Sequence, residues 1–234
     1  MKKITIILVL PLIFYSVQNA FTQNSKWELS LYGGYSLPTN ILEQHQYYDS
    51  ANKLSGYNIG ISTSYYIRKQ KDLSLTGSLN FNHLLSTYHY ENGIEFDGMA
   101  DIYLNIVSLD IGIKYKFLPK GKVDPFVDMD LSSNYYTGHT DIFEDFSIDE
   151  TTYRLKPAFR LGLKLGTGVE IKVSSKIGVI AGYNFNFSNI IGRSINLDYI
   201  EGQYSLNDGI NSEFYNKGFD IFYSQFYSGI SFHL

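Results

Sequence analysis

Apolar and polar residues alternate with a period of two along most of this chain. In the final stretch, FYSQFYSGISFHL, five apolar residues stand at even positions, with polar or small residues between them: Phe222, Phe226, Ile230, Phe232 and Leu234 against Gln225, Gly229, Ser231 and His233. Such alternation is typical of a β-strand with one apolar face. The pattern predicts a strand that continues to the last residue.

The same alternation predicts eight strands in all. They cover the segments 27–36, 57–67, 73–82, 103–117, 123–132, 155–173, 179–188 and 219–234. Each has ten or more residues. An ordinary strand has about five or six, whereas a tilted strand that crosses a membrane needs about 9–11. The lengths therefore favour strands that span a membrane.

The connections between these segments alternate in length. Three are tight, at 68–72, 118–122 and 174–176, and four are long and polar, at 37–56, 85–102, 134–154 and 192–218. Short turns at one end and longer loops at the other are typical of outer-membrane barrels. We therefore predict an all-β fold: an eight-stranded antiparallel up-and-down transmembrane β-barrel.

The two faces of the predicted strands differ in chemistry. The less apolar face is rich in Gly, Ser and Asn and carries charged residues: Asp110, Lys114, Lys116, Asp124, Asp128, Asp130, Arg160 and Lys164. The interior of an eight-stranded barrel is just wide enough to be filled by side chains. We expect these residues to form an interior charge network, with the apolar face turned outward to lipid.

An assumed register pairs some of these charges. The tight turn between the fourth and fifth segments would place Lys116 near Asp124. The next hairpin is assumed to pair Asp128 with Arg160. Asp124 then meets Lys164. Opposite charges across neighbouring strands stabilise a sheet, and unpaired buried charges cost several kcal/mol.

The N-terminus has the features of an export signal. Two lysines precede the apolar run 4–17, and the small residues Ala20 and Thr22 follow as candidate cleavage positions. We predict a cleaved signal peptide at 1–22 and a barrel domain at 23–234; the alternative is a short hydrophobic helix or an uncleaved anchor. No later run of 18 apolar residues offers a transmembrane helix.

The composition narrows the possible functions. The 234-residue chain has no cysteine, which excludes a disulfide framework, a thiolate nucleophile and a cysteine metal site. Charged residues make up 18 %, below the roughly 25 % of an ordinary soluble domain. The net charge is -4 and the basic residues are scattered, so no nucleic-acid partner is expected.

Aromatic residues, 21 of them tyrosines, gather near the predicted strand ends. Those closest to the ends are Trp27, Tyr65, Tyr66, Tyr115, Tyr135, Tyr136, Tyr153, Tyr223 and Tyr227. Aromatic girdles flank the apolar band of a membrane barrel. We expect membrane-interface aromatics at Trp27, Tyr65, Tyr115, Tyr135 and Tyr223, although aromatics in loops could instead bind glycans.

The chain also resembles a known family. The exported N-terminus and the stretches KWELSLYGGYSLP, FRLGLKLGTGVEIKVSSKIGVIAGYNFNF and GISFHL together resemble the PorT-like eight-stranded outer-membrane β-barrel domain family, over nearly all of the chain after the signal. The resemblance implies a place in the cell outer membrane, contact with its lipid, and recognition of the last strand by the barrel-assembly machinery during insertion. That recognition usually favours a terminal aromatic residue, and here the last residue is Leu234. One branch of the family takes part in protein secretion.

Candidate chemistry is sparse. His83 and His89 flank LLSTY near the predicted rim, where a lipid hydrolase or acyltransferase site could lie; the alternative is a polar residue at the interface. No Gly-x-Ser-x-Gly motif is present. The acidic stretch 141–150 offers oxygen ligands for Ca²⁺, but its spacing is not that of an EF-hand and solvated carboxylates are the alternative. We expect no catalytic residue, metal or cofactor.

These observations support a leading function and three alternatives. The leading one is a monomeric, non-enzymatic outer-membrane barrel with a polar, plugged interior. It would serve envelope structure or surface interaction through four extracellular loops, with an extracellular or periplasmic protein partner left open. The alternatives are an accessory barrel of a protein-secretion system, a lipid-modifying enzyme that uses His83 or His89, and a soluble lipocalin-like carrier with an apolar interior.

Overall fold

The computed structural model describes residues 26–40, 48–67, 72–92, 96–144, 151–191, 203–204 and 221–234. Over these ranges the chain forms nine strands: β1 (Trp27–Asn40), β2 (Tyr48–Tyr66), β3 (Leu73–Asn92), β4 (Phe96–Lys116), β5 (Val123–Glu144), β6 (Thr151–Lys172), β7 (Ile177–Ile191), β8 (Gln203–Tyr204) and β9 (Phe222–His233). No helix in these ranges is long and apolar enough to cross a membrane. The predicted signal peptide lies outside the described residues.

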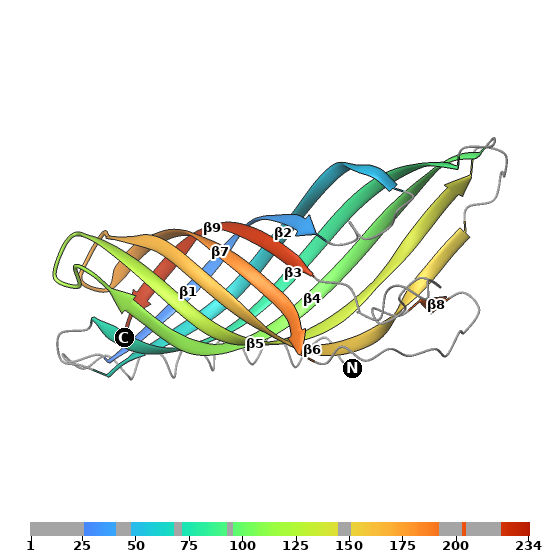
Figure 1. Ribbon diagram of the computed structural model, residues 1–234. Helices are drawn as coiled ribbons and strands as arrows, with labels where there is room; N and C mark the ends of the chain where they lie inside the picture. The colour runs from blue at the N-terminus through green and yellow to red at the C-terminus, as the bar shows by residue number, and fades with distance from the viewer. Residues whose placement is uncertain are drawn as a thin grey trace, which may run out of the picture.

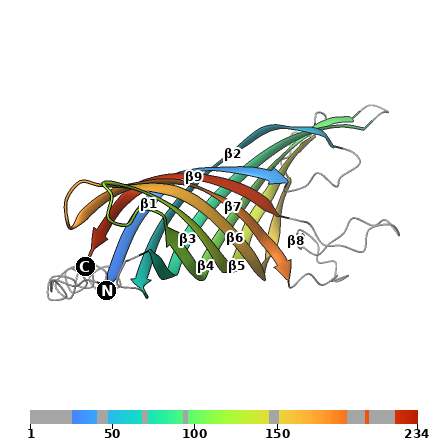
Figure 2. The same ribbon diagram turned by 60° about the vertical axis from the view of Figure 1, so that its left-hand side comes forward.

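Eight of the strands close into a barrel (Figures 1 and 2). Consecutive long strands pair antiparallel, β1 pairs with both β2 and β9, and β5 pairs with β6, so the ring has no free seam. The two-residue β8 adds to β6 in parallel, outside this ring. The predicted eight-stranded antiparallel barrel is confirmed.

The first and last strands pair up to the end of the chain. Glu28 lies opposite His233, and the backbone N–H of Leu234 donates to the carbonyl of Trp27 at 2.9 Å. In a closed barrel the last strand must satisfy the hydrogen-bonding groups of the first, because hydrocarbon offers no water. The predicted continuation of strand pairing to the last residue is confirmed.

The two ends of the barrel differ in length. The connections 117–122 and 173–176 lie at one end, which we call the turn end, and we call the opposite end the loop end. There β3, β4 and β5 run on past the ends of β1, β7 and β9 (Figure 1). Much of the predicted loops 85–102 and 134–154 is therefore strand. The prediction was wrong because a strand outside hydrocarbon needs no apolar face, only a partner for its backbone.

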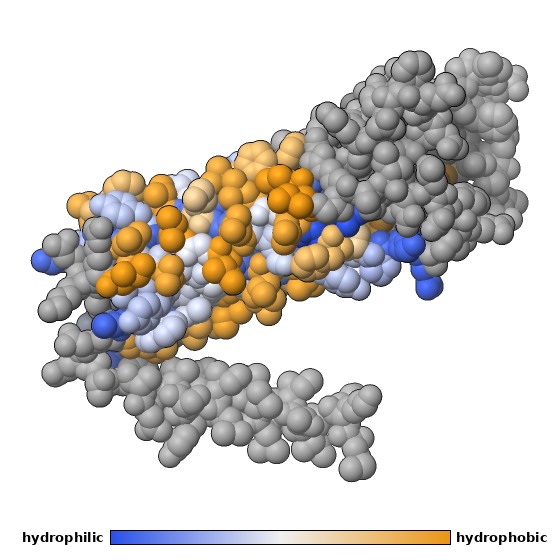
Figure 3. Space-filling model, turned by 60° about the horizontal axis from the view of Figure 1, so that its bottom comes forward, coloured by the Kyte–Doolittle hydropathy of each residue, from blue (hydrophilic) through white to orange (hydrophobic). Residues whose placement is uncertain are grey.

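An apolar band encircles the barrel from the turn end upward. On β4 and the residue after it, every second side chain is between 41 % and 65 % exposed: Val107, Leu109, Ile111, Ile113, Tyr115 and Phe117. Apolar residues cover the barrel wall in Figure 3. The band extends from 107 to 117 on this strand, which is the length that a tilted membrane-spanning strand needs, about 9–11 residues.

The inward face of the same strands is polar and buried. Glu28, Asp110, Asp124 and Glu170 are each at most 1 % exposed. This polarity is the reverse of a soluble barrel, which buries apolar side chains inside. The lipocalin-like alternative is therefore wrong.

The predicted register of the β4–β5 hairpin is wrong by two residues. Lys116 lies opposite Phe126 rather than Asp124. The reason is a longer connection than expected, since the N–H of Phe117 bonds to the carbonyl of Pro125 at 2.9 Å. Residues 118–124 are thus enclosed by this bond, and the pairing shifts accordingly.

The predicted pairing of β5 with β6 is also wrong. Lys164 lies opposite Asp130, not Asp124, and Arg160 lies opposite Asn134, not Asp128. The predicted register depended on the long connection 134–154. Its composition does not show how much of this connection forms strand. Lys164 nevertheless meets a carboxylate.

A β-bulge at Pro157 changes which side chains of β6 face inward. Tyr136 pairs with Ala158, but Gly138 pairs with Leu155, so β6 contains one extra residue. Proline has no N–H to donate to the ladder and commonly marks a bulge. Leu155, predicted on the outward apolar face, is consequently inside the barrel and only 4 % exposed.

The apolar band predicts where a charge is tolerated. Leu131 lies opposite Ile111 near the middle of the band and is 72 % exposed, whereas Thr137 on the same strand lies opposite Asn105 above it. We expect Leu131→Arg to lower the free energy of unfolding by about 2–4 kcal/mol and Thr137→Arg by about 0–1 kcal/mol. Urea unfolding in lipid bilayers measures both, and equal losses would contradict this placement of the band.

Candidate functional site: the barrel interior

Three charged residues form what we call the central cluster, halfway along the barrel. Lys164 on β6 places its Nζ 2.7 Å from Asp110 Oδ2 on β4 and 2.9 Å from Asp130 Oδ2 on β5. All three side chains are almost completely buried. One ammonium therefore bridges two carboxylates from different strands.

Short polar side chains complete the central cluster. Ser78 Oγ and Asn80 Nδ2 donate to Asp110 at 2.9 and 2.5 Å, Ser132 donates to its other oxygen, and Thr76 Oγ1 donates to Asp130 at 2.6 Å. Buried ions are stable only when further hydrogen bonds satisfy them. The Ser, Asn and Thr residues of the inward face provide those bonds.

A second group of charges, the turn-end cluster, lies near the turn end. Lys116 on β4 donates to Glu28 Oε2 on β1 at 2.7 Å and to Glu170 Oε2 on β6 at 2.5 Å. Tyr66 on β2 accepts a third bond from Lys116 at 2.8 Å and donates its own proton to Glu28. All three ammonium hydrogens of Lys116 are thus used.

The last strand also joins the turn-end cluster. Ser231 Oγ donates to Glu170 Oε1 at 2.5 Å, and His233 Nε2 lies 2.8 Å from the same oxygen. Residues from β1, β2, β4, β6 and β9 therefore meet at one point. The cluster ties the first strand to the last, across the interior as well as along the seam.

The turn-end cluster contains a donor set that a metal ion could use. One ligand atom each from Glu28, Glu170 and His233 lies within 4.8 Å of the others, and carboxylate with imidazole suits several divalent metals. The ammonium of Lys116 already lies between the two carboxylates and supplies the compensating charge. A metal ion would have to displace it.

Two predicted network residues belong to neither cluster. Arg160 is buried nearer the loop end, where its Nη1 donates to the carbonyl of Phe159 at 2.7 Å. Asp124 is buried at the turn end and accepts from the N–H of Leu118 at 3.1 Å. The eight residues predicted as one network are therefore divided among several places along the interior.

The remaining two line the space between the clusters. Lys114 Nζ lies 3.6 Å from Glu28 Oε1 and 4.9 Å from the centre of the Phe126 ring. Together with Asp128 it borders a space of about 30 Å³ beside Lys164. Such a volume holds one or two water molecules. Side chains fill the interior here almost completely.

Above the central cluster part of the interior is apolar, beside buried polar residues such as Asn82. Seven side chains form what we call the apolar plug, each at most 4 % exposed: Leu84, Leu104, Ile106, Tyr136, Leu155, Ile221 and Tyr223. Tyr136 donates its hydroxyl proton to the carbonyl of Ser188 at 2.6 Å. The sequence had predicted an interior that is polar throughout. The structure instead has a packed apolar layer near the loop end.

The predicted interior network did not include Glu28, Glu170 or the apolar plug. A signal existed for the two carboxylates, because both lie on the polar face of their predicted strands. Leu104 and Ile106 likewise have the same parity as Asp110. They were overlooked because apolar residues on both faces hide the alternation.

Four of the five predicted interface aromatics face outward. Trp27 is 50 % exposed and packs on Tyr65, with ring centres 4.9 Å apart, at the turn end. Tyr115 is exposed near the same end, and Tyr135 is exposed at the top of the apolar band. The rings thus lie toward both edges of the band.

Tyr223 contradicts the prediction. It is 1 % exposed inside the apolar plug, where Asn82 donates to its hydroxyl at 3.3 Å. Tyr66 and Tyr136 are also buried inside. Tyr227 is likewise turned inward, with its ring 5.0 Å from that of Tyr32. All four have the parity of the inward face, which proximity to a strand end had obscured.

Glycine makes room for rings in this narrow interior. A Cβ atom on Gly60 would lie 2.6 Å from Cζ of Tyr32, and one on Gly182 would lie 2.5 Å from Cζ of Tyr227. Real Cβ atoms do not approach other atoms so closely. A tyrosine ring can therefore occupy this interior where the facing wall carries glycine.

His83 lies outside the barrel at the upper edge of the apolar band. Its Nδ1 is 2.8 Å from Asn105 Oδ1, and its ring lies 5.1 Å from that of Tyr57 and 6.3 Å from that of Tyr103. This is the setting of a polar residue at an interface. The side chain of His89 and residues 145–150 of the acidic stretch lie outside the described residues.

The chain is similar to known outer-membrane proteins. A family described as outer membrane protein beta-barrel domain matches residues 7–223. The comparison with curated proteins found no match.

Among solved structures, the chain is 16 % identical to Neisserial surface protein A, with a TM-score of 0.50 over 90 % of this chain and 98 % of that one. The attachment invasion locus protein Ail of Yersinia pestis is 12 % identical, with a TM-score of 0.43 over 88 % and 98 %. The N-terminal β-barrel domain of Pseudomonas aeruginosa OprF is 15 % identical, with a TM-score of 0.42 over 90 % and 97 %. At such identities the likeness shows the fold alone.

The turn-end cluster predicts a strong dependence on Lys116. Lys116→Met would leave Glu28 and Glu170 buried without their shared cation, and we expect a loss of about 3–5 kcal/mol in the free energy of unfolding. Adding Glu28→Gln and Glu170→Gln to that variant should restore a large part. Urea unfolding in lipid bilayers provides the measurement, with the exposed Lys122→Met as a control that changes stability by less than about 0.5 kcal/mol. A stable single variant would show that the cluster is not ionic.

Proposed function

The chain belongs to the outer membrane protein beta-barrel domain family, and from this premise we propose that it is a non-enzymatic, non-conducting barrel that makes contacts at the cell surface through its loop end. Its place is the outer membrane. Barrels of this kind have short periplasmic turns and longer extracellular loops, so the loop end faces the outside of the cell.

The observation that carries this proposal is the sheet that rises above the apolar band. Residues 96–106 of β4 pair with β3 on one side, and all but the first two also pair with β5 on the other. About half of β4 therefore stands outside the membrane as hydrogen-bonded strand. A paired sheet presents side chains in fixed positions, which favours a role in surface contact.

The apolar plug supports the same proposal. It lies inside the barrel at the base of the raised sheet and includes Leu84 of β3, Leu104 of β4 and Tyr136 of β5. Close packing there fixes the strands as they leave the membrane. The plug together with the two charge clusters also blocks the interior, which supports a barrel that passes no solute.

The non-enzymatic part of the proposal rests on the surroundings of His83. Its hydrogen-bond partner among the described side chains is the amide of Asn105, whereas a general base needs a nucleophile or water activated by it and a group to orient it. The surroundings of His83 among the described residues thus give no further support to a lipid hydrolase or acyltransferase site.

Membership of the PorT-like family, the monomeric state and insertion by the barrel-assembly machinery belong to the same proposal. The sequence stretches quoted above support that membership. The closed ring supports a monomer, because no strand edge within the apolar band is free to pair with a second copy. Pairing of the last strand up to Leu234 supports recognition of that strand during assembly.

Conductance tests the blocked interior. Purified protein in a planar bilayer should give no steady current steps, because side chains occupy the full cross-section at three levels of the barrel. An open porin inserted under the same conditions serves as the positive control. Steady, large steps from this protein would overturn the non-conducting assignment.

Trimming the raised sheet tests surface contact. Replacing residues 87–101 by Asn-Gly would join Ser86 to Ile102, which are opposite each other, through a two-residue hairpin. The variant should still show heat-modifiable migration, because the apolar band is intact. Attachment of whole cells to protein-coated and glycan-coated surfaces should fall to the level of cells without the protein. Lys120→Ser at the turn end is the control, and unchanged attachment of the trimmed variant would contradict the proposal.

A further inference from the structure

A pocket opens at the turn end of the barrel, outside the turn-end cluster. Its volume is about 150 Å³, and its walls include Pro119, Asp124, Lys172, Ser175 and His233. A cavity of roughly this volume accepts a molecule the size of benzene. With the turns on the periplasmic side, the pocket faces the periplasm.

The polar groups on the inner side of the pocket belong to the turn-end cluster. Lys116 also borders it, but its three hydrogens go to Glu28, Glu170 and Tyr66. His233 lies 2.8 Å from Glu170. Lys116 therefore has no hydrogen left for a ligand, whereas Nε2 of His233 is in close contact with Glu170 without making a hydrogen bond.

Among the charged wall residues, Asp124 and Lys172 have hydrogen-bonding capacity left for a ligand. Asp124 is fully buried, and while its Oδ1 accepts from Leu118, its Oδ2 has no hydrogen-bond partner among the described residues. Lys172 donates one hydrogen to the carbonyl of Pro119, which leaves two. A buried carboxylate oxygen without a partner is unfavourable, so a donor at this position would stabilise it.

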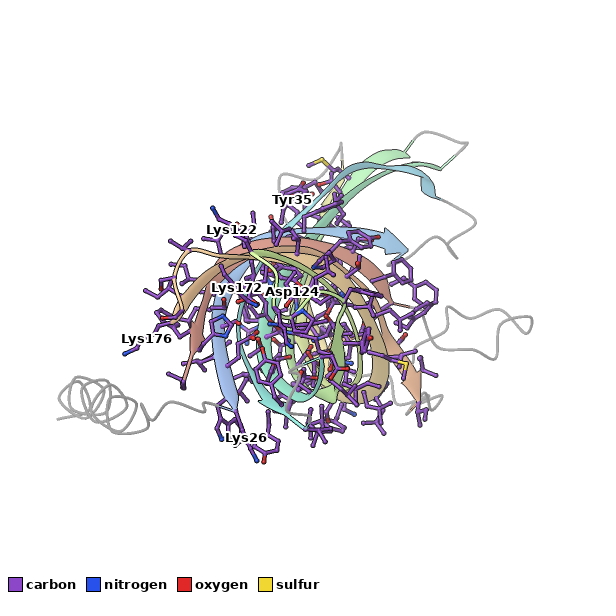
Figure 4. All side chains as sticks on the ribbon, turned by 90° about the vertical axis from the view of Figure 1, so that its left-hand side faces the viewer. Lys26, Tyr35, Lys122, Asp124, Lys172 and Lys176 are labelled. Atoms are coloured by element: carbon purple, nitrogen blue, oxygen red, sulfur yellow. The ribbon has the colours of Figure 1, made fainter. Side chains whose placement is uncertain are left out.

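The two groups have opposite charge and attract each other, but they are not in direct ion-pair contact within the described residues. Both border the same cavity. Figure 4, viewed from the turn end, places Asp124 and Lys172 within the ring of strands. A small molecule with a positive group at one end and a negative group at the other would complement both.

We propose that this pocket binds a zwitterion of amino-acid size, with its ammonium at Asp124 and its carboxylate at Lys172. The hydroxyl of Ser175 lies on the exposed side of the pocket and is available to either end. Around the opening, Lys120, Lys122 and Lys176 are exposed, and clustered charges of one sign raise the local concentration of an oppositely charged group. The carboxylate of the ligand is the end that these lysines attract.

Calorimetric titration of the full chain in detergent micelles at low ionic strength tests the proposal. Three probes are compared: L-alanine, which carries both charges, ethylammonium, which carries only the positive charge, and acetate, which carries only the negative charge. L-alanine should bind with a dissociation constant on the order of 1 mM or below, and the other two at least about tenfold more weakly. Asp124→Asn and Lys172→Gln should each weaken L-alanine about tenfold or more.

Two further variants keep the test independent of folding. Ser175→Trp, at an exposed position of the turn, should fill the pocket and abolish binding without disturbing the buried charges. Lys176→Gln, on the same turn, should leave affinity within about twofold. Heat-modifiable migration verifies that each variant forms the barrel. No saturable heat with L-alanine would overturn the proposal. Equal binding of ethylammonium would also overturn it, because the carboxylate would then contribute nothing. Full affinity of the Ser175 variant would place the bound molecule outside this pocket and overturn it too.

Discussion

The structure depends on one constraint: a backbone amide or carbonyl in hydrocarbon must find its hydrogen-bond partner within the protein. For β-strands this is possible only in a closed ring, because an open sheet leaves the outer groups of two edge strands without partners. β1 and β9 complete that ring, and their pairing extends to the N–H of Leu234. The closed ring and the pairing of the last strand follow from this requirement, whereas the thickness of the bilayer sets the length of the apolar band.

In the closed barrel, the polar and charged side chains of the interior must find their hydrogen-bond partners and counter-charges among one another. Each charge there is removed from water, and such burial is tolerated only when partners and hydrogen bonds replace the lost hydration. Lys164 and Lys116 each serve two carboxylates, and the surrounding Ser, Thr, Asn and Tyr side chains use the remaining sites. Because carboxylates and ammoniums come from different strands, the clusters also link parts of the wall that do not neighbour one another in the sheet.

Above the membrane, water can pair with backbone groups, so the strands no longer have to form a closed ring. The strands accordingly end at different heights. β3, β4, β5 and β6 continue as a paired sheet, while β1, β7 and β9 end lower (Figure 2). The apolar plug lies where these two groups of strands diverge. The lower barrel is thus a closed ring, and the strands that continue above it form a sheet whose backbone groups are still paired.

The sequence by itself determined the strand number, the barrel class and the direction in which most side chains point, because alternation is a local property that persists over ten or more residues. It also identified Asp110, Asp130 and Lys164 as interior charges. Their partners were a matter of register, which depends on the length of each connection, and composition does not reveal where a hairpin turns outside hydrocarbon. Only the tertiary structure showed that Lys116 joins Glu28 and Glu170, that the bulge at Pro157 turns Leu155 inward, and that Tyr223 packs in an apolar layer. These features arise from contacts across the barrel between residues far apart in sequence. The alternation of residues along the chain carries no information about such contacts.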